Sequence, residues 1–304
     1  MRLFKKGSRA HNRLSEVKKN GFLFNLLGLL PLIWGALFVV MILWGFGVSV
    51  ADEEWYLDHA NEFFPKVLDF SNYEKALEKF TFESYADGEL ITTTYFTLIW
   101  NSLWFSFGMT ATKMVATVFF AYAVAKFEFP GRKFLYAFII VQMMLPIYGQ
   151  TAANYQLLDS LGLVDSPLFL IGQGAGHGMY FLIVYACFRN LPSGYAEAAK
   201  IDGAGPFTVF FKVMLPQARP IIVSLSVMQF ISAWNSYDVP LLYLPSYPTL
   251  STALYLFKDN MFQLGLSTPT YFAGMLISII PVAVLFLIFN KQIMNNISIG
   301  GMKG

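Results

Sequence analysis

An aromatic ring, an amide and a carboxylate stand close together in one short stretch of the sequence, at Trp234, Asn235, Tyr237 and Asp238. An aromatic ring stacked on a sugar face, beside a few well-placed polar groups, is a common way for proteins to hold saccharides. These residues are therefore candidate ligands for a sugar. Because 17% of the chain is aromatic, packing explains Trp234 at least as well. Solvation at an interface explains Asp238 equally well.

Two further polar residues stand in apolar surroundings. Lys113 interrupts the apolar run 90–125. A cation there costs free energy unless it meets a carboxylate, faces an aqueous path or extends to the polar edge of a membrane. Gln142 lies shortly before Pro146, and a proline inside a helix frees a backbone carbonyl and can kink the helix towards a cavity. A structural kink without any ligand is the alternative for this segment.

Catalytic chemistry has little support. Apart from Lys113, the apolar runs contain only His177 and Asp238 as histidine or charged residues, each in a different run. An active site or a metal site needs several such residues at acid–base or ligand spacing. Cys187 is the sole cysteine, which excludes an intramolecular disulfide and a zinc site built from cysteines. No G-x-x-x-x-G-K-[ST] motif occurs, so we predict no catalytic residues, no metal site and no cofactor in this chain.

The composition places these residues in a membrane protein. The chain is 56% hydrophobic and 13% charged, whereas soluble domains are about 45–50% apolar and about 25% charged. About 20 apolar residues cross a bilayer, and a crossing segment must be helical because no backbone group can stay unpaired in lipid. We therefore predict an all-α membrane protein with six transmembrane helices, from the runs at residues 21–51, 90–125, 134–158, 166–188, 220–244 and 271–290.

Lysine and arginine are distributed unevenly over the connections. They concentrate in the tail 1–20, after the second run, in the segment 189–219 and in the tail 291–304, whereas the segment 52–94 is acidic. Cytoplasmic loops carry the excess of basic residues, so both termini are expected in the cytoplasm. The net charge of +2 gives no sign of nucleic-acid binding; the basic first tail is expected to set the topology and to contact anionic lipid.

Five parts follow from these patterns. They are a basic cytoplasmic tail (1–20), a first transmembrane helix (21–51), an acidic extracytoplasmic segment (52–94), a five-helix core (95–290) with a cytoplasmic loop (189–219), and a cytoplasmic C-terminal tail (291–304). The acidic segment is rich in aromatic residues. We expect it to form short amphipathic helices that rest on the outer face of the membrane.

The loop 189–219 carries helix signals of its own. Pro192 ends the preceding helix, and Ser193 or Gly194 is expected to cap a short helix from Tyr195 to Ile201. If Gly194 is the cap, Glu197 occupies the third helical position, where a carboxylate interacts favourably with the helix N-terminus.

The rest of the loop predicts a turn and a second helix. Asp202-Gly203 is a turn signal, Pro206 suits the first position of a helix that runs to Met214, and Leu215-Pro216 is expected to end it. The small side chains of Ala198 and Ala199 would let another protein approach the first helix closely. A helix that merely lies on lipid is the alternative.

The offsets of these residues resemble the cytoplasmic coupling motif of permease subunits of bacterial ABC importers. The resemblance is carried by Glu197-Ala198-Ala199, Ile201-Asp202-Gly203-Ala204 and Leu215-Pro216. Other stretches resemble the carbohydrate importers of this family, the maltose-type subunit in the case of the C-terminal tail. They are Phe70-Ser71-Asn72-Tyr73 with Leu77, Asn101-Ser102-Leu103, Ala121-Tyr122-Ala123, Phe127 with Phe129-Pro130-Gly131-Arg132, Gln229-Phe230 with Trp234-Asn235, and the tail Gly300-Gly301-Met302-Lys303-Gly304.

The resemblance implies a type I ABC importer permease fold and an assembly in a bacterial or archaeal cytoplasmic membrane. The implied partners are a second permease subunit in a heterodimer, an ATPase dimer that binds ATP and Mg, and an extracytoplasmic sugar-binding protein. Glu197 would be the charged contact to the ATPase, Ala198 and Ala199 the close-packing face, and Asp202-Gly203 the turn. Met302 and Lys303 in the tail would form a second contact to the ATPase.

The function that this resemblance implies is that of a permease subunit for a mono- or oligosaccharide. It would not be an enzyme itself, because ATP hydrolysis belongs to its partner. A permease of the same superfamily for a polyamine, phosphate or a peptide is the nearest alternative. A membrane-embedded enzyme and a purely structural membrane scaffold are the alternatives from other classes.

Overall fold

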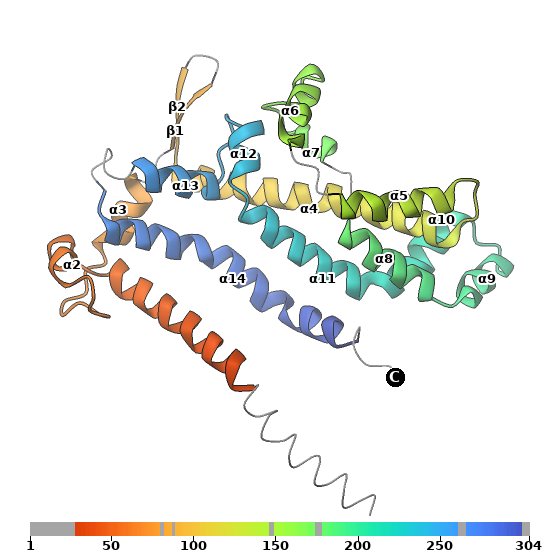
Figure 1. The fold of residues 1–304 in the computed structure, drawn as a ribbon, viewed down its shortest axis with the longest axis horizontal. Helices are drawn as coiled ribbons and strands as arrows, with labels where there is room; N and C mark the ends of the chain where they lie inside the picture. The colour runs from red at the N-terminus through yellow and green to blue at the C-terminus, as the bar shows by residue number, and fades with distance from the viewer. Residues whose placement is uncertain are drawn as a thin grey trace, which may run out of the picture. The chain divides into compact units, whose positions relative to one another are not determined.

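The computed structural model describes residues 28–79, 82–86, 89–145, 149–173, 178–260 and 266–299, and these are mostly helical (Figure 1). The chain divides into two compact units. The described part of unit 1 is 28–74 with 266–276, and that of unit 2 is the remainder. The helix α14 (Thr268–Ile299) begins in the first unit and continues in the second.

One buried amide side chain joins three segments of unit 1 by hydrogen bonds. Unit 1 contains the helix Gly28–Ser49, α2 (Glu53–His59) and the start of α3 (Ser71–Lys79). Asn72, at the start of α3, donates from Nδ2 to the carbonyls of Ser49 (3.1 Å) and Ala51 (2.8 Å) and accepts from the Thr270 hydroxyl (3.3 Å). Asn72 thus joins the end of the first helix, α3 and the start of α14.

Removing this amide is expected to destabilise unit 1. Asn72→Ala leaves two buried carbonyls without their donor, which costs about 1–3 kcal/mol for an unpaired buried polar group. The thermal midpoint of the purified protein should fall. Asn61→Ala removes the same side chain from an exposed position and should leave the midpoint unchanged; equal midpoints for the two variants would contradict the role of Asn72.

Unit 2 is built around the long helix α4 (Tyr95–Lys126). α4 runs alongside α11 (Leu215–Trp234), and α8 (Met179–Asn190) packs on α4 in the half nearer α9 (Figure 1). The remaining elements are β1 (Phe82–Ala86), β2 (Glu89–Thr93), α5 (Arg132–Met144), α6 (Gln150–Ser160), α7 (Phe169–Gly172), α9 (Ser193–Ile201), α10 (Pro206–Thr208), the π-helical turn η1 (Val209–Met214), α12 (Asp238–Tyr243) and α13 (Leu250–Asn260).

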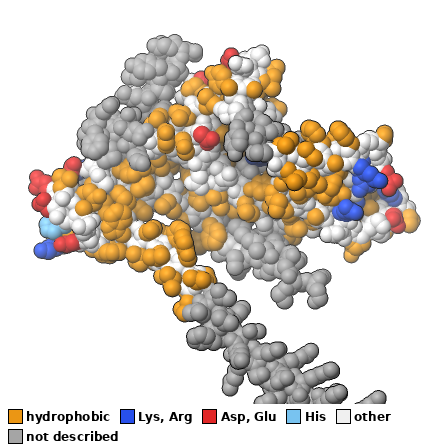
Figure 2. Space-filling view, viewed as in Figure 1, with side chains coloured by type: hydrophobic (Ala, Val, Ile, Leu, Met, Phe, Trp, Pro, Cys, Tyr) orange, Lys and Arg blue, Asp and Glu red, His pale blue; other side chains and the backbone are white. Residues whose placement is uncertain are grey.

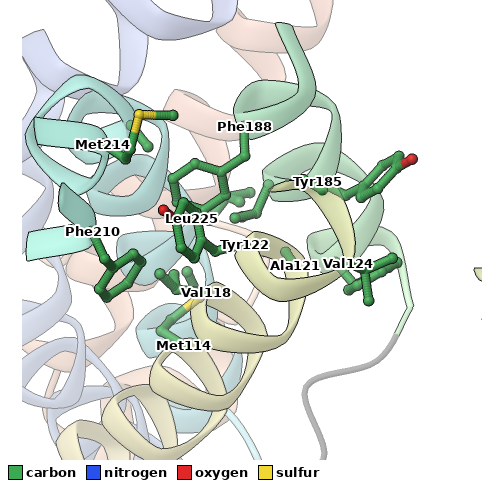
Figure 3. Packing of buried hydrophobic residues seen from close by; sticks show 14 of the residues in the cluster. Met114, Val118, Ala121, Tyr122, Val124, Tyr185, Phe188, Phe210, Met214 and Leu225 are labelled. Atoms are coloured by element: carbon green, nitrogen blue, oxygen red, sulfur yellow. The ribbon is translucent and has the colours of Figure 1, made fainter. Parts of the chain in front are cut away.

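Aromatic side chains join α4, α8 and η1 into one core. The ring of Tyr122 on α4 lies 5.2 Å from that of Phe188 on α8 and 4.6 Å from that of Phe210 on η1 (Figure 3). Phe188 and Phe210 are buried, as is Met214 beside them. This core fixes η1, and with it the start of α11, against α4.

The predicted spans are only partly observed as single long helices. Within the described residues, four helices are long and apolar enough to cross a membrane: Gly28–Ser49, Tyr95–Lys126, Pro206–Trp234 and Thr268–Ile288. The runs 134–158 and 166–188 do not form continuous helices, contrary to the prediction. They contain α5 then α6, and α7 then α8, and Gly149 and Gly178 precede α6 and α8 with φ of +86° and +101°, a conformation that a helix does not allow.

The acidic segment contains helices, as predicted, and also a β-hairpin that the sequence reading did not anticipate. α2 and α3 are the short helices, and β1 pairs antiparallel with β2, from Phe82 opposite Thr93 to Ala86 opposite Glu89. The two strands are only five residues long and show no regular alternation of polar and apolar residues, so no strand pattern stood out from the helical signals around them.

The surface of unit 2 is strongly divided in character. Figure 2 shows Lys and Arg side chains gathered at the end that carries α9, and hydrophobic side chains over much of the surface between the two ends. Lys133, Arg189 and Lys212 are among the exposed basic residues of this end. Such a band of apolar surface beside a basic end is typical of a membrane protein whose basic end faces the cytoplasm.

Candidate functional site

The short helix of the 189–219 loop exists, and it starts earlier than predicted. α9 begins at Ser193, and its N-cap is Pro192 in an extended conformation rather than Ser193 or Gly194. Glu197 is therefore the fifth residue of α9 and not the third, so the expected interaction with the helix N-terminus is wrong. The Glu197 side chain is exposed on the surface of α9.

The predicted turn closes α9 with a complete hydrogen-bonded cap. Gly203 has φ of +83°, its N–H donates to the Lys200 carbonyl (3.0 Å), and the Ala204 N–H donates to the Ala199 carbonyl (2.9 Å). This pair of bonds with a left-handed residue between them is a Schellman motif. It turns the chain sharply from α9 into α10.

A side chain at this glycine is expected to weaken the turn. A β-branched residue is strained at positive φ by about 1–2 kcal/mol. Gly203→Val should therefore weaken the turn and make α9 unfold locally more often. Limited proteolysis of the loop in the purified protein should become faster. Gly194→Ala is the matched control, because a Cβ at Gly194 meets no atom within 4 Å; equal cleavage of the two variants would contradict the role of Gly203.

α9 presents two different faces. Ala196 and Ala199 pack against the core of α4, α8 and η1. Tyr195, Ala198 and Ile201 are exposed, Ile201 to 86%. The two alanines of the motif therefore do different things: Ala199 seats α9 on its own subunit, and only Ala198 leaves a small side chain on the outside.

Large apolar side chains continue this outer surface beyond the turn. Phe207 on α10 is 76% exposed, and Phe211 on η1 is about half exposed. We call Tyr195, Glu197, Ala198, Ile201 and Phe207 the α9 face. Exposed apolar side chains of this kind are typical of contacts with another protein or with a membrane.

The second helix of the loop does not end where the sequence predicted. α10, η1 and α11 form one continuous helix from Pro206 to Trp234. The Leu215 N–H donates to the Phe210 carbonyl, five residues back, and Pro216 sits in the first turn of α11. The π turn re-registers the helix just before the proline, which lacks a donor, and so Leu215-Pro216 is accommodated inside the helix.

The aromatic and polar cluster at the other end of α11 borders a cavity. A cavity of about 130 Å³ is lined by residues from α11, its C-terminal cap, α13 and α14: Trp234, Asn235, Leu250, Ser251, Leu254, Ser278, Ile279 and Val282. The Ser251 hydroxyl donates to the Trp234 carbonyl, and Asn235 donates from Nδ2 to the Ile231 carbonyl (2.9 Å). The structure thus brings Trp234 and Asn235 together at one cavity.

Of the two aromatic candidates in this stretch, Trp234 is buried and Tyr237 is partly exposed. Trp234 is only 4% exposed and stacks on Phe230. Tyr237 stacks instead on Tyr255 of α13, with ring centroids 4.2 Å apart and planes 14° from parallel. Each of the two tyrosines is about two-fifths exposed. Ser251 and Tyr255 were missed by the sequence analysis. They stand four residues apart in a stretch that mixes polar and apolar residues and shows no binding motif.

The other candidate residues lie apart from this cavity. Asp238 is exposed at the start of α12, where it accepts from the Ser236 hydroxyl (2.9 Å). Its charge and, more strongly, burial raise the pKa of Tyr243. Lys113 is half-buried midway along α4, and Gln142 is exposed near the end of α5. Neither Lys113 nor Gln142 lines the cavity.

A larger groove of about 290 Å³ lies between α4 and α11, and it suits a sugar poorly. Apolar side chains such as Phe107 and Phe230 dominate its lining. Its two hydroxyls already donate to backbone carbonyls of their own helices. Thr110 donates to the Ser106 carbonyl (2.7 Å), and Ser226 donates to the Ile222 carbonyl (2.8 Å). A saccharide needs directional polar partners, so the smaller cavity is the better candidate.

Two predicted contacts, Met302 and Lys303 of the C-terminal tail, fall outside the residues that the structure describes. His177 of the fourth run, for which no role was predicted, also lies outside them. In the described part of the chain, no group of three or more His, Cys, Asp or Glu side chains could hold a metal ion.

Comparison with known proteins gives the same overall picture. The family model described as "binding-protein-dependent transport system inner membrane component" matches residues 114–298, more than half of the chain. The arabinooligosaccharides transport system permease protein AraQ of Bacillus subtilis is 26% identical over 245 residues, 79% of this chain and 81% of its own length. The galactooligosaccharides transport system permease protein GanQ of the same organism is 29% identical over 208 residues, 67% of this chain and 73% of its own.

The fold is also found among solved structures. A chain of a bacterial ABC transporter involved in the import of the acidic polysaccharide alginate superimposes with a TM-score of 0.71, at 22% identity, over 88% of this chain and 96% of that one. The family match covers the coupling loop, α11 and the cavity beside it. The chain therefore belongs to the family of inner-membrane components of binding-protein-dependent transport systems.

Proposed function

We propose that this protein is a permease subunit of an ATP-driven importer of mono- or oligosaccharides and that the α9 face is its contact with the ATPase. The observation that carries the proposal is the exposure of Tyr195 and Ile201 on α9, and of Phe207 on α10, at the basic end of unit 2. α9 itself packs on the core of this unit. Relatives named for arabino- and galactooligosaccharide transport support a saccharide as the solute.

The proposed assembly has four kinds of component. This subunit and a second permease form the path, an ATPase dimer that binds ATP and Mg lies against the α9 face, and a solute-binding protein docks on the opposite side. Both termini and the loop 189–219 lie in the cytoplasm, and the chain crosses the membrane six times. The four long apolar helices support four of these crossings, and α5–α6 and α7–α8 supply the other two.

The ATPase contact is proposed to work by shape and apolar burial. Ala198 leaves room for close approach, Ile201 and Phe207 supply apolar area, and Glu197 adds a charged contact at the edge. Met302 and Lys303 are proposed to form the second contact. Rigid-body motion of the ATPase would then shift α9 and the long helix that follows it.

The function is tested by transport in a defined system. The complex purified through a tag on this chain is reconstituted into proteoliposomes with ATP inside and the solute-binding protein outside. Uptake of α-1,5-arabinotriose or β-1,4-galactotriose that requires ATP is the expected result. ATP-dependent uptake of spermidine, phosphate or a dipeptide, with neither trisaccharide taken up, would assign the chain to another solute.

The topology is tested by labelling from each side. Ile201→Cys is made in a Cys187→Ala background, so that the introduced thiol is the sole cysteine. A membrane-impermeant maleimide should react in inside-out vesicles from cells that express the permease without its ATPase, and not in intact cells of the same strain. Reaction in intact cells would place α9 outside and overturn the proposed coupling.

A further inference from the structure

The cavity at the end of α11 has the size and lining for one ring of a sugar. Sites for drug-sized ligands occupy about 300–1,000 Å³, so a cavity of about 130 Å³ holds one ring and not a whole oligosaccharide. It still exceeds by far the space that a single water molecule requires. Leu250, Leu254 and Val282 supply an apolar wall, and none of the lining residues is charged.

Its polar groups leave hydrogen-bonding capacity for hydroxyls. Ser251 uses its proton on the Trp234 carbonyl, so its oxygen remains an acceptor. Asn235 uses one N–H on the Ile231 carbonyl, which leaves its second N–H and its carbonyl oxygen. Vicinal hydroxyls of a sugar can both donate and accept, and they match such a pair of side chains.

The stacked tyrosines do not line the cavity themselves, but each is close in sequence to a residue that does. Tyr255 follows Leu254 on α13, and Tyr237 lies two residues after Asn235. The Thr252 hydroxyl donates to the Tyr237 carbonyl (3.2 Å), which ties the segment carrying Tyr237 to α13. An exposed, pre-stacked pair of rings offers a flat apolar surface of the kind on which a sugar ring packs.

We propose that this cavity and the Tyr237–Tyr255 pair form a subsite for one ring of a neutral saccharide, in which Ser251 and Asn235 bind hydroxyls and Tyr255 packs against the sugar face. The absence of any basic residue in the lining disfavours an acidic sugar. The proposal rests on the proposed import of saccharides and assigns part of the specificity to this subunit.

Protection of an introduced thiol tests the subsite directly. Leu254→Cys, in the Cys187→Ala background, is placed in the whole transporter complex in nanodiscs and reacted with a small maleimide. β-1,4-galactotriose or α-1,5-arabinotriose should slow the reaction. Tyr255→Ala should raise the saccharide concentration that gives half-maximal protection roughly tenfold, whereas Tyr255→Phe and Tyr56→Ala, a tyrosine of unit 1, should stay within about twofold of the parent. Val282→Cys, on the opposite wall, provides a second reporter if Leu254→Cys impairs folding.

Three results would overturn the subsite. The first is a labelling rate that does not change when saccharides imported by the same complex are added. The second is slow labelling without any sugar, because the partner permease or lipid fills the cavity. The third is protection by tri-galacturonic acid equal to that by the neutral trisaccharides. The failure of the subsite differs from failure of the proposed function, since uptake and labelling are separate measurements. Import without protection rejects the subsite alone, whereas a wild-type complex that imports no saccharide rejects the function on which it rests.

Discussion

Replacing Ile201 with aspartate is expected to abolish ATP-driven uptake while the permease stays folded. Ile201 is 86% exposed and contributes nothing to the core of unit 2, so its loss leaves the fold intact. At the proposed ATPase interface the same change would bury an unpaired carboxylate, which costs about 1–3 kcal/mol, and remove an apolar anchor worth about 2 kcal/mol or more. The affinity of the purified ATPase for the permease in nanodiscs should fall roughly 100-fold.

A graded series at the same position separates packing from charge. Ile201→Leu keeps the apolar volume and should retain both ATPase binding and uptake, and Ile201→Ala should fall between leucine and aspartate. All three variants should melt at the wild-type temperature. If Ile201→Asp binds the ATPase as tightly as the wild type does, the α9 face is not the contact.

Two phenylalanines three residues apart are expected to give opposite phenotypes. Phe210 is 3% exposed and packs on Tyr122 and Phe119, whereas Phe207 is 76% exposed. Phe210→Ala should lower the unfolding free energy by about 3–5 kcal/mol, as expected for truncating a buried aromatic side chain. Phe207→Ala should change the unfolding free energy by less than about 0.5 kcal/mol. It should instead weaken binding of the ATPase to the permease.

Thermal denaturation and ATPase binding, measured on both variants, check this crossed expectation. Because the two substitutions remove the same atoms, general effects of losing a phenylalanine, such as altered expression or detergent binding, are the same in both variants. Comparable destabilisation by both would mean that the apolar surface of α10 is covered within this subunit. Comparable loss of ATPase binding with unchanged melting would mean that Phe210 is not part of the core.

The sequence predicted the helical class, the short helix before Asp202 and the turn at Gly203, because these depend on local signals. Asp202-Gly203 and Pro206 act over a few residues, and the end of α9 and the start of α10 follow them closely. The breaks within the third and fourth runs were missed because an apolar composition does not reveal where glycine adopts positive φ, as at Gly149 and Gly178.

Several motifs that looked functional in the sequence are structural in the folded chain. Phe129-Pro130-Gly131-Arg132 forms a turn with Gly131 at φ of +90° and a bond from the Arg132 N–H to the Phe129 carbonyl, the arrangement of a type II turn. Asn101 donates to the Pro248 carbonyl (3.0 Å), and the Ser102 hydroxyl accepts from the Leu250 N–H at the start of α13 (2.7 Å). The roles of Asn101 and Ser102 depend on residues far away in the sequence, so spacing alone could not assign them.

The candidate sugar site was predicted only in outline. Trp234 and Asn235 do line a cavity, but the exposed rings belong to Tyr237 and Tyr255. Burial of Trp234 depends on its contact with Phe230, and the second tyrosine comes from another helix. A linear pattern identifies which residues are suitable for binding a ligand, whereas the exposure of each ring is decided by tertiary packing.

The unbroken helix from Pro206 to Trp234 has a mechanical consequence. At 1.5 Å per residue it reaches about 43 Å, with Phe207 near one end and the cavity at the other. A rod of this kind cannot be tilted at one end without displacing the other, so ATPase motion and sugar release would share a single moving part. Its wide turn at η1 and Pro220 inside α11 are places where such a rod can yield, and their rigidity would set how much of each nucleotide-driven stroke arrives at the solute.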